Sequence, residues 1–260
     1  MSVKTCVILL SENKGIIFMK EKVLGVLGGM GPMATAYFLK IVTDMTEAQI
    51  DQQHIPMLIC NHTTIPDRTA FILGQSNENP VPPLCEDALF LEKSGADILA
   101  MTCNTAHNFY EQVQEKVKIP LLHIVKETVE FIAKRDNKCK KIGILATKGT
   151  LKSGVYQDFC NQNGLQAVIP DKSVSDMLMN IIYQKIKKGK KVSVGEFLGI
   201  IDDMREICGC DAVILGCTEL SVIKSDLNLN RYDIIDSLEI LAKRSIEECG
   251  KKIKSDYFTE

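Results

Sequence analysis

The chain has 260 residues, of which 45% are hydrophobic and 25% are charged. These proportions are typical of a globular protein and exclude a disordered chain, a collagen-like repeat and a coiled coil. The 31 basic and 33 acidic residues leave a formal net charge of −2. Because there is no basic excess to neutralise phosphates, we expect no binding to DNA or RNA.

The best candidate for a membrane segment is the apolar run 6–10, far shorter than the roughly 20 residues that a transmembrane helix needs. The sequence also lacks the pattern of a signal peptide, so we expect a cytoplasmic protein that does not associate with membranes. Its ten cysteines are scattered along the chain. Without an export signal, this distribution indicates reduced thiols rather than a disulfide framework.

Residues 1–22 are predicted to be an N-terminal extension without a catalytic role, with a hairpin formed by 6–10 and 16–18 around a polar turn. From residue 23 onwards, short apolar runs alternate with longer amphipathic stretches, which is typical of parallel sheets built from β–α–β units. The predicted strands are 23–27, 57–60, 98–101, 121–124, 142–146, 166–169, 212–215 and 233–235. The predicted helices are 32–46, 83–93, 105–117, 125–133, 154–163, 173–188, 194–208 and 237–249.

Three segments of the first half recur, in the same order, in the second half. The matching pairs are 24–27 with 142–145, 95–103 with 209–217, and 119–124 with 232–237. The repeat predicts an α/β fold of two pseudo-symmetric small domains, each a parallel sheet flanked by helices, with the active site in the cleft between them. We place these domains at 23–125 and 126–236, and join the C-terminal helix, 237–260, to the first.

The repeat places a cysteine at equivalent positions of the two halves, Cys103 and Cys217. Each follows the predicted carboxyl end of a strand and precedes a helix, where open α/β sheets bind ligands. A helix N-terminus lowers the pKa of a thiol and offers free N–H groups to a carboxylate. If the Cα of an amino acid lay between the sulfurs, one thiolate could remove its proton while the opposite thiol returned one to the other face. This chemistry inverts the stereocentre.

Small polar residues stand beside the two cysteines. Asn104 and Thr105 follow Cys103, and Thr218 follows Cys217. We predict that these residues bind the substrate, with their backbone N–H groups directed at its carboxylate.

Four motifs resemble those of the aspartate/glutamate racemase family, and most closely its aspartate racemase branch. They are LGVLGGMGPMAT (24–35), CNHTTIPDRT (60–69), MTCNTAH (101–107) and LGCTEL (215–220). The resemblance implies two pseudo-symmetric α/β domains and makes Cys103 and Cys217 the acid/base pair. It further implies activity without pyridoxal phosphate or metal, and a substrate pocket lined by the backbone around Met30.

The segment that follows the second predicted strand contributes three further candidates for substrate binding, Asn61, Thr64 and Arg68. The planar guanidinium of Arg68 suits a side-chain carboxylate, which it can bind with two hydrogen bonds. The alternative is an ordinary surface arginine, and the family motif favours the site. The glycine-rich turn at 28–32 lacks the G-x-G-x-x-G spacing, so we do not expect it to bind a dinucleotide.

A basic cluster at 185–191 contains mostly lysines that complement a helix end. Some members of the family have a pocket lysine in this region, for which Lys187 fits best and Lys185 is the alternative. His107, on the same predicted helix as Cys103, either tunes that thiolate or is a buried structural histidine.

Two features near the second predicted active cysteine leave alternatives open. Glu219 stands where glutamate racemases have a histidine and is a candidate to assist the thiol two residues before it. Cys208 and Cys210 form a C-x-C pair, but no second pair of ligands accompanies them, so we expect no metal site.

These features together predict a cofactor-independent isomerase that racemises an acidic amino acid, most closely an aspartate racemase. The alternatives are a glutamate or broad-specificity racemase of the same mechanism, and a non-catalytic protein that binds acidic amino acids. We expect a small-molecule substrate as its partner and a homodimer as its assembly.

Overall fold

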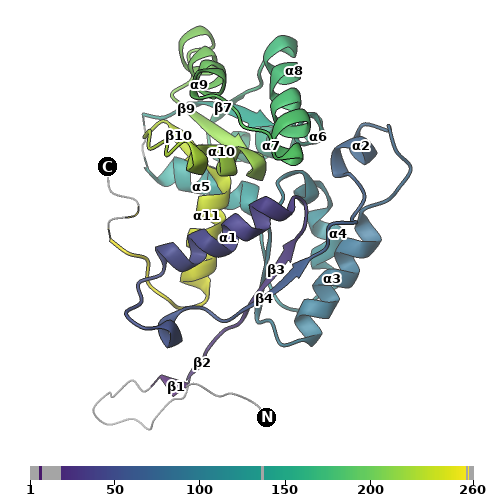
Figure 1. The fold of residues 1–260 in the computed structure, drawn as a ribbon, viewed down its shortest axis with the longest axis vertical. Helices are drawn as coiled ribbons and strands as arrows, with labels where there is room; N and C mark the ends of the chain where they lie inside the picture. Colours follow the sequence, from purple (N-terminus) through teal and green to yellow (C-terminus); the bar gives the residue numbers. More distant parts are fainter. Residues whose placement is uncertain (1–5, 8–18, 136–137, 256, 258–260) are drawn as a thin grey trace.

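The computed structural model describes residues 6–7, 19–135, 138–255 and 257. The elements form two lobes, which Figure 1 shows with the first half of the chain below and most of the second half above. At the N-terminus, β1 (Cys6–Val7) pairs with β2 (Met19–Lys20) in antiparallel fashion. The other residues of the predicted hairpin, 8–10 and 16–18, lie outside the described residues, and β2 follows its predicted second arm.

Each lobe contains a four-stranded parallel sheet, in the order β4–β3–β5–β6 in the first and β8–β7–β9–β10 in the second. The strands are β3 (Leu24–Gly28), β4 (Met57–Asn61), β5 (Ile98–Met101), β6 (Leu121–Leu122), β7 (Lys141–Ala146), β8 (Gln166–Val168), β9 (Ala212–Gly216) and β10 (Ile234–Asp236). Leu24 pairs with Ile98, and Ile142 pairs with Ala212, so the repeated segments occupy equivalent registers. The predicted fold of two similar α/β halves is confirmed.

Helices flank both sheets. They are α1 (Pro32–Met45), α2 (Arg68–Ile72), α3 (Val81–Lys93), α4 (Tyr110–Gln114), α5 (Ile124–Arg135), α6 (Lys148–Ser153), α7 (Val155–Gln162), α8 (Lys172–Asn180), α9 (Val194–Asp202), α10 (Thr218–Asp226) and α11 (Ser237–Glu248). Short 3₁₀ turns occur at η1 (Asp51–Gln53), η2 (Thr105–Phe109) and η4 (Ile186–Lys188), and π-helical turns occur at η3 (Ile181–Lys185) and η5 (Asp203–Ile207). Within the described ranges, none of the helices has the length and apolar character that a membrane span requires.

Three predicted α-helices differ in detail from the structure. The segment 105–117 divides into η2 and α4, 173–188 divides into α8, η3 and η4, and 194–208 divides into α9 and η5. The predicted α-helical N-terminus after Cys103 is therefore wrong: a 3₁₀ turn follows instead. Its residues are fixed by tertiary contacts. Thr105 is hydrogen-bonded to Thr147, His107 accepts the N–H of Ile124, and both side chains are buried.

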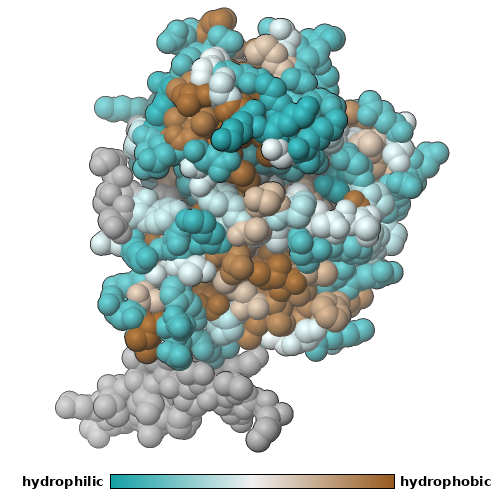
Figure 2. Space-filling view, viewed as in Figure 1, coloured by the Kyte–Doolittle hydropathy of each residue, from teal (hydrophilic) through white to brown (hydrophobic). Residues whose placement is uncertain are grey.

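The core joins the two lobes. All residues of β3 and β9 are buried, as expected for parallel strands covered on both faces. One apolar cluster includes Val26 of the first sheet, Ile144 of the second, and Leu241 of α11. Helix α11, drawn in yellow, lies beside α1 and α5 (Figure 1). Figure 2 shows further apolar side chains on the visible surface of the lower lobe.

Candidate active site

Cys103 and Cys217 line one small pocket between the lobes. Cys103 lies two residues beyond β5 and Cys217 directly follows β9, so both stand at carboxyl ends of equivalent strands. Each is 5% exposed. The cavity measures about 10 Å³, which is close to the space of one water molecule. The other lining residues are Met30, Asp67, Arg68, Thr69, Asn104, Thr105, Thr147, Tyr183, Lys187, Thr218 and Glu219.

The sulfur of Cys217 lies against a carboxylate. Cys217 is the extended N-cap residue of α10, and its thiol donates a hydrogen bond to Oε2 of Glu219 over 3.0 Å. Burial raises the pKa of Cys217 well above its usual value, and the charge and hydrogen bond of Glu219 raise it further. The thiol form of Cys217 is therefore favoured at neutral pH, ready to donate a proton.

The sulfur of Cys103 lies instead against a cation, the guanidinium of Arg68. Arg68 is buried, and burial lowers its pKa, but the charge of Cys103, the charge of Asp67 and a hydrogen bond to Cys103 together raise it. The two cysteines thus have opposite electrostatic partners, although the sequence repeat makes their backbone positions equivalent.

Backbone carbonyl groups hold Arg68 in place. It donates hydrogen bonds to the carbonyl oxygens of Ile65 (3.1 Å), Pro66 (3.0 Å) and Met30 (3.2 Å). The segment around Met30 reaches this position because Gly29 adopts a φ of +89°, which favours glycine. A Cβ at this position would also lie only 2.4 Å from the backbone of His62. The alternative interpretation of Arg68 as a surface residue is wrong.

Lys187 reaches the pocket, whereas Lys185 does not. The Nζ of Lys187 lies 3.7 Å from Oε1 of Glu219, 3.9 Å from Oδ2 of Asp67 and 4.4 Å from the centre of the Tyr183 ring. Lys185 pairs with a glutamate of α9 at 2.6 Å. The π-helical turn η3, followed by the 3₁₀ turn η4, changes the helical pitch and so decides which lysine faces inward.

Two buried polar atoms at the pocket have no hydrogen-bond partner in the structure. They are the Nε of Arg68, a donor, and the Oε1 of Glu219, an acceptor. Glu219 Oε1 faces Gly31, where an added Cβ would lie 3.1 Å away. Because unpaired buried polar groups are costly, these two atoms are available to pair with a ligand in the pocket. A zwitterion, which carries both a carboxylate and an ammonium, would satisfy both.

The polar residues that accompany the cysteines are held by contacts across the two halves. Asn104 donates to Ser237 over 3.0 Å and accepts from Tyr156 over 2.6 Å, and Thr105 lies 2.9 Å from the hydroxyls of two threonines of the second half. The hydroxyl of Thr218 donates to the carbonyl oxygen of Thr102 over 3.3 Å. Their side chains are therefore occupied, which leaves backbone N–H groups for a substrate.

Asn61 and Thr64, both predicted to bind the substrate, do not line the pocket. Asn61 ends β4, and both side chains are exposed to solvent. The tight packing of Gly29 against His62 turns the chain here, so that the pocket receives Arg68 from the end of the same loop. A role for Asn61 and Thr64 in substrate binding stays a prediction.

His107 lies behind the pocket and contacts the backbone of Cys103. Its Nδ1 is 2.8 Å from the carbonyl oxygen of Cys103, while its Nε2 accepts the N–H of Ile124 over 3.2 Å. The second bond requires an unprotonated Nε2, so Nδ1 carries the hydrogen. Burial lowers the pKa of His107 to about 4, which keeps the ring neutral. These contacts match the structural interpretation of this histidine.

The profile of the family described as Asp/Glu/Hydantoin racemase matches residues 27–244. The chain belongs to this family. It is accordingly an enzyme of the isomerase class. The match spans both sheets and includes both pocket cysteines.

Individual proteins to which the chain is similar are also racemases. A broad-specificity amino-acid racemase, RacX of Bacillus subtilis, is 29% identical over 231 residues, which cover 86% of this chain and 96% of that protein. The structure of Picrophilus torridus aspartate racemase is 33% identical, with a TM-score of 0.79 and coverage of 91% of this chain and 97% of that one. A glutamate racemase of Aquifex aeolicus is 28% identical, with coverage of 72% and 73%.

Four lining residues of this pocket are not among those predicted from the sequence, namely Asp67, Thr69, Thr147 and Tyr183. The hydroxyl of Tyr183 donates to Asp67 over 3.1 Å, and that of Thr69 donates to Thr147 over 3.1 Å. Both contacts join residues of opposite halves. Asp67 stands within one of the recognised motifs and was available as a signal, whereas no spacing in the sequence distinguishes Tyr183 from other helical residues.

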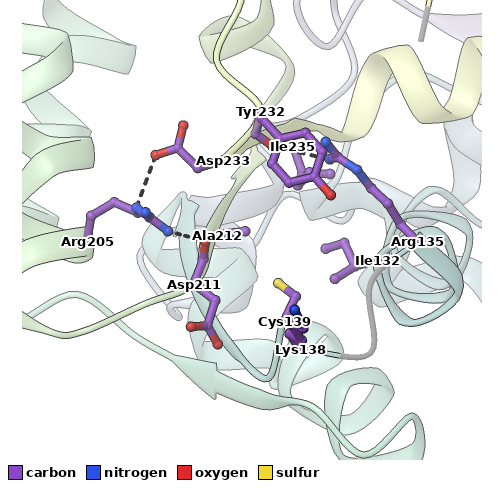
Figure 3. Close-up of a pocket in the computed structure, with 10 residues that line it drawn as sticks. All are labelled: Ile132, Arg135, Lys138, Cys139, Arg205, Asp211, Ala212, Tyr232, Asp233 and Ile235. Atoms are coloured by element: carbon purple, nitrogen blue, oxygen red, sulfur yellow. Dashed lines mark hydrogen bonds and ion pairs between the residues drawn. The ribbon is translucent and has the colours of Figure 1, made fainter. Parts of the chain in front are cut away.

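A larger cavity, of about 220 Å³, lies at the amino ends of β7, β9 and β10. Figure 3 shows Arg205 directed at Asp233 and Arg135 lying over the ring of Tyr232. The first contact measures 3.0 Å, and the guanidinium of Arg135 is 3.4 Å from the ring centre. Both arginines of this cavity therefore already have partners. Parallel sheets bind ligands at the carboxyl ends of their strands, whereas this cavity lies at the amino ends. In the described chain, no three His, Cys, Asp or Glu residues are grouped as a metal site needs.

Proposed function

We propose that the enzyme interconverts L- and D-aspartate without pyridoxal phosphate, by proton transfer through Cys103 and Cys217. The observation that carries the proposal is the opposite environment of two thiols in one pocket: Cys103 beside Arg68, and Cys217 beside Glu219. A racemase needs a base on one face of Cα and an acid on the other. The similarity to an aspartate racemase over nearly the whole chain supports the choice of substrate.

Individual polar groups of the pocket match the three charged groups of an acidic amino acid. Free N–H groups of the first turn of α10 suit the α-carboxylate, and the unpaired Oε1 of Glu219 suits the α-ammonium. Lys187 contacts its two carboxylates only at 3.7 and 3.9 Å, which leaves it able to bind the side-chain carboxylate together with the Nε of Arg68. Because the closed cavity holds about one water molecule, the lobes must separate slightly to admit the substrate.

In one direction, the thiolate of Cys103 takes the proton from Cα, and the electron pair of the C–H bond stays on the substrate. The S–H bond of Cys217 then breaks and delivers its proton to the opposite face of Cα. Cys103 is left as a thiol and Cys217 as a thiolate, and Glu219 is placed to assist proton return to Cys217. The reverse reaction uses the same steps in the opposite order.

Solvent deuterium and chiral analysis test this mechanism. Cys103→Ala and Cys217→Ala should each lower racemisation by about 10²-fold or more, because each lacks one proton-transfer group. Each variant should still exchange the Cα proton of one enantiomer in D₂O. Full two-way racemisation by either variant would contradict the two-thiol mechanism. Cys160→Ala, at a fully buried cysteine of α7 away from the pocket, is the matched control.

The similarity to RacX favours a second candidate, a broad-specificity racemase of the same mechanism. Rates of exchange for aspartate, glutamate and neutral amino acids discriminate between these specificities. Binding without any deuterium incorporation would instead indicate the non-catalytic alternative. Activity that depends on added pyridoxal phosphate would contradict the proposal.

A further inference from the structure

A second cavity, here called the vestibule, adjoins the cysteine pocket. It measures about 350 Å³, within the usual range of small-molecule pockets of about 300–1,000 Å³. The vestibule and the cysteine pocket have five lining residues in common, which are Met30, Asp67, Arg68, Lys187 and Glu219. The two cavities therefore meet at these shared side chains.

Beyond the shared side chains, the walls of the vestibule are mainly apolar. Ile65 belongs to the loop after β4, Ile186 to η4 and Val222 to α10, while Met33 of α1 stands at the rim with 65% of its surface exposed. The first half supplies Met33 and Ile65, and the second half supplies Ile186 and Val222. The flexible thioether of Met33 can adapt to ligands of different shape.

The charged groups where the cavities meet are balanced. Two cations, Arg68 and Lys187, face two carboxylates, Asp67 and Glu219. A neutral zwitterion keeps this balance, whereas a dicarboxylate adds a negative charge. The pocket therefore contains no excess of cations that would require a second carboxylate on every substrate.

We propose that the vestibule is a side-chain subsite, through which the enzyme also racemises amino acids with unbranched apolar side chains, such as norleucine and methionine. This inference rests on the proposed function, because it needs Cα to lie between the two cysteines. The α-carboxylate and α-ammonium then occupy the cysteine pocket. The side chain passes the aliphatic stem of Lys187 and contacts Ile186 and Val222.

Exchange of the Cα proton in D₂O, followed by NMR, tests the subsite on L-alanine, L-norvaline, L-norleucine and L-methionine beside L-aspartate. Burial of each added methylene should raise kcat/KM by about fourfold along the series from alanine to norleucine. The subsite would be overturned if the Cα proton of aspartate exchanged and that of norleucine did not, or if kcat/KM did not rise along the series. Absence of exchange for every amino acid would overturn the proposed function itself.

Variants that fill the vestibule provide the second test. Ile186→Trp and Val222→Trp should each lower the ratio of kcat/KM for norleucine to that for aspartate by about tenfold, because the added ring occupies the space of several methylenes. Ile207→Trp, at a position 79% exposed and outside both cavities, should leave the ratio unchanged. An unchanged ratio in both filled variants would overturn the proposal, and agreement between them excludes a local folding defect as the cause.

Discussion

The two oxygens of Glu219 face different groups. Oε2 accepts the hydrogen bond of Cys217, while the buried Oε1 has no partner and lies 3.7 Å from Lys187. A carboxylate can therefore serve the thiol and still have a free acceptor for an ammonium. Glu219 thus offers one oxygen to the thiol of Cys217 and the other to a ligand in the pocket.

The first residue-scale prediction is that Glu219→Gln weakens binding of aspartate more than binding of succinate, which lacks the ammonium. Loss of a charge-assisted hydrogen bond should raise the Kd for aspartate by about tenfold or more, and leave that for succinate equal or lower. Calorimetry with racemic aspartate gives the affinity, because turnover does not change its composition. Glu206→Gln, at an exposed position, is the control. Equal weakening of both ligands would contradict the ammonium contact.

At the scale of elements, α2 and η3 form the contact that closes the pocket. Tyr183 of η3 donates to Asp67, the N-cap of α2, and Lys187 of η4 faces the same carboxylate. Burial raises the pKa of Tyr183, so its hydroxyl remains a donor at neutral pH. These contacts join the two lobes directly over a cavity that is too small for an amino acid.

Removal of this hydroxyl should favour the open state. Tyr183→Phe should increase the rate at which iodoacetamide labels Cys103 and Cys217 by about fivefold, which corresponds to the loss of one hydrogen bond of about 1 kcal/mol. Mass spectrometry locates the labels, and the fully buried Cys160 provides an internal reference. Tyr110→Phe removes a comparable hydroxyl contact, of 2.8 Å, away from the pocket. Identical labelling in the two tyrosine variants would exclude the closing role.

The division of the chain at residues 125 and 236 stays a prediction, and α11 gives it support. This helix packs against α1 and α5 and also contacts β5 and β6 of the first sheet. Asp236 accepts hydrogen bonds from the first turn of α11 and thereby fixes where the helix begins.

At the scale of the whole molecule, an aromatic cluster joins the lobes behind Cys103. The rings of His107 and His123 are 4.9 Å apart, and His123 is also 4.9 Å from Phe159 of the second half. Burial lowers the pKa of His107 to about 4 and that of His123 to about 3. Folding therefore favours neutral rings, while the unfolded chain binds protons near the usual pKa of about 6.5.

These lowered pKa values make the folded protein less stable as the pH falls. The stability contributed by His107 is complete above pH 6.5 and falls as the pH decreases towards 4. Burial raises the pKa of Glu239 from its usual 4.5 to about 7. Between these two pH values, Glu239 therefore makes the folded state more stable as the pH falls, which opposes the effect of the histidines. A comparison of the wild type with a His107 variant isolates the effect of His107, because both proteins contain Glu239.

We predict that His107→Gln reduces the dependence of unfolding free energy on pH between 4.5 and 6 by about 1.4 kcal/mol per pH unit, the effect of one proton. Urea unfolding at a series of pH values measures it. His54→Gln, outside the aromatic cluster, is the control. Equal slopes in the wild type and His107→Gln would contradict the buried neutral state of this ring.

The predicted homodimer and cytoplasmic location stay predictions. Light scattering during size-exclusion chromatography measures the assembly. Uncovered apolar side chains on the lower lobe, visible in Figure 2, are the surface type that such an interface uses.

The sequence by itself determined the two α/β halves and the equivalence of Cys103 and Cys217. Apolar runs at the spacing of parallel strands are a local signal, and the repeat carries that signal twice. The motif segments likewise indicated Arg68 and the backbone of Met30, both of which the structure places at the pocket. Asn61 and Thr64 belong to the same motif, yet the turn at Gly29 leaves their side chains in solvent.

Only the tertiary structure decided that Arg68 lies beside Cys103, and which contacts close the pocket. The choice between Lys187 and Lys185 depends on a π-helical turn, which the apolar periodicity does not reveal. The contact of Tyr183 with Asp67 joins residues 116 positions apart. Such contacts arise because two independently patterned halves pack against each other, and no local spacing encodes which side chains then meet.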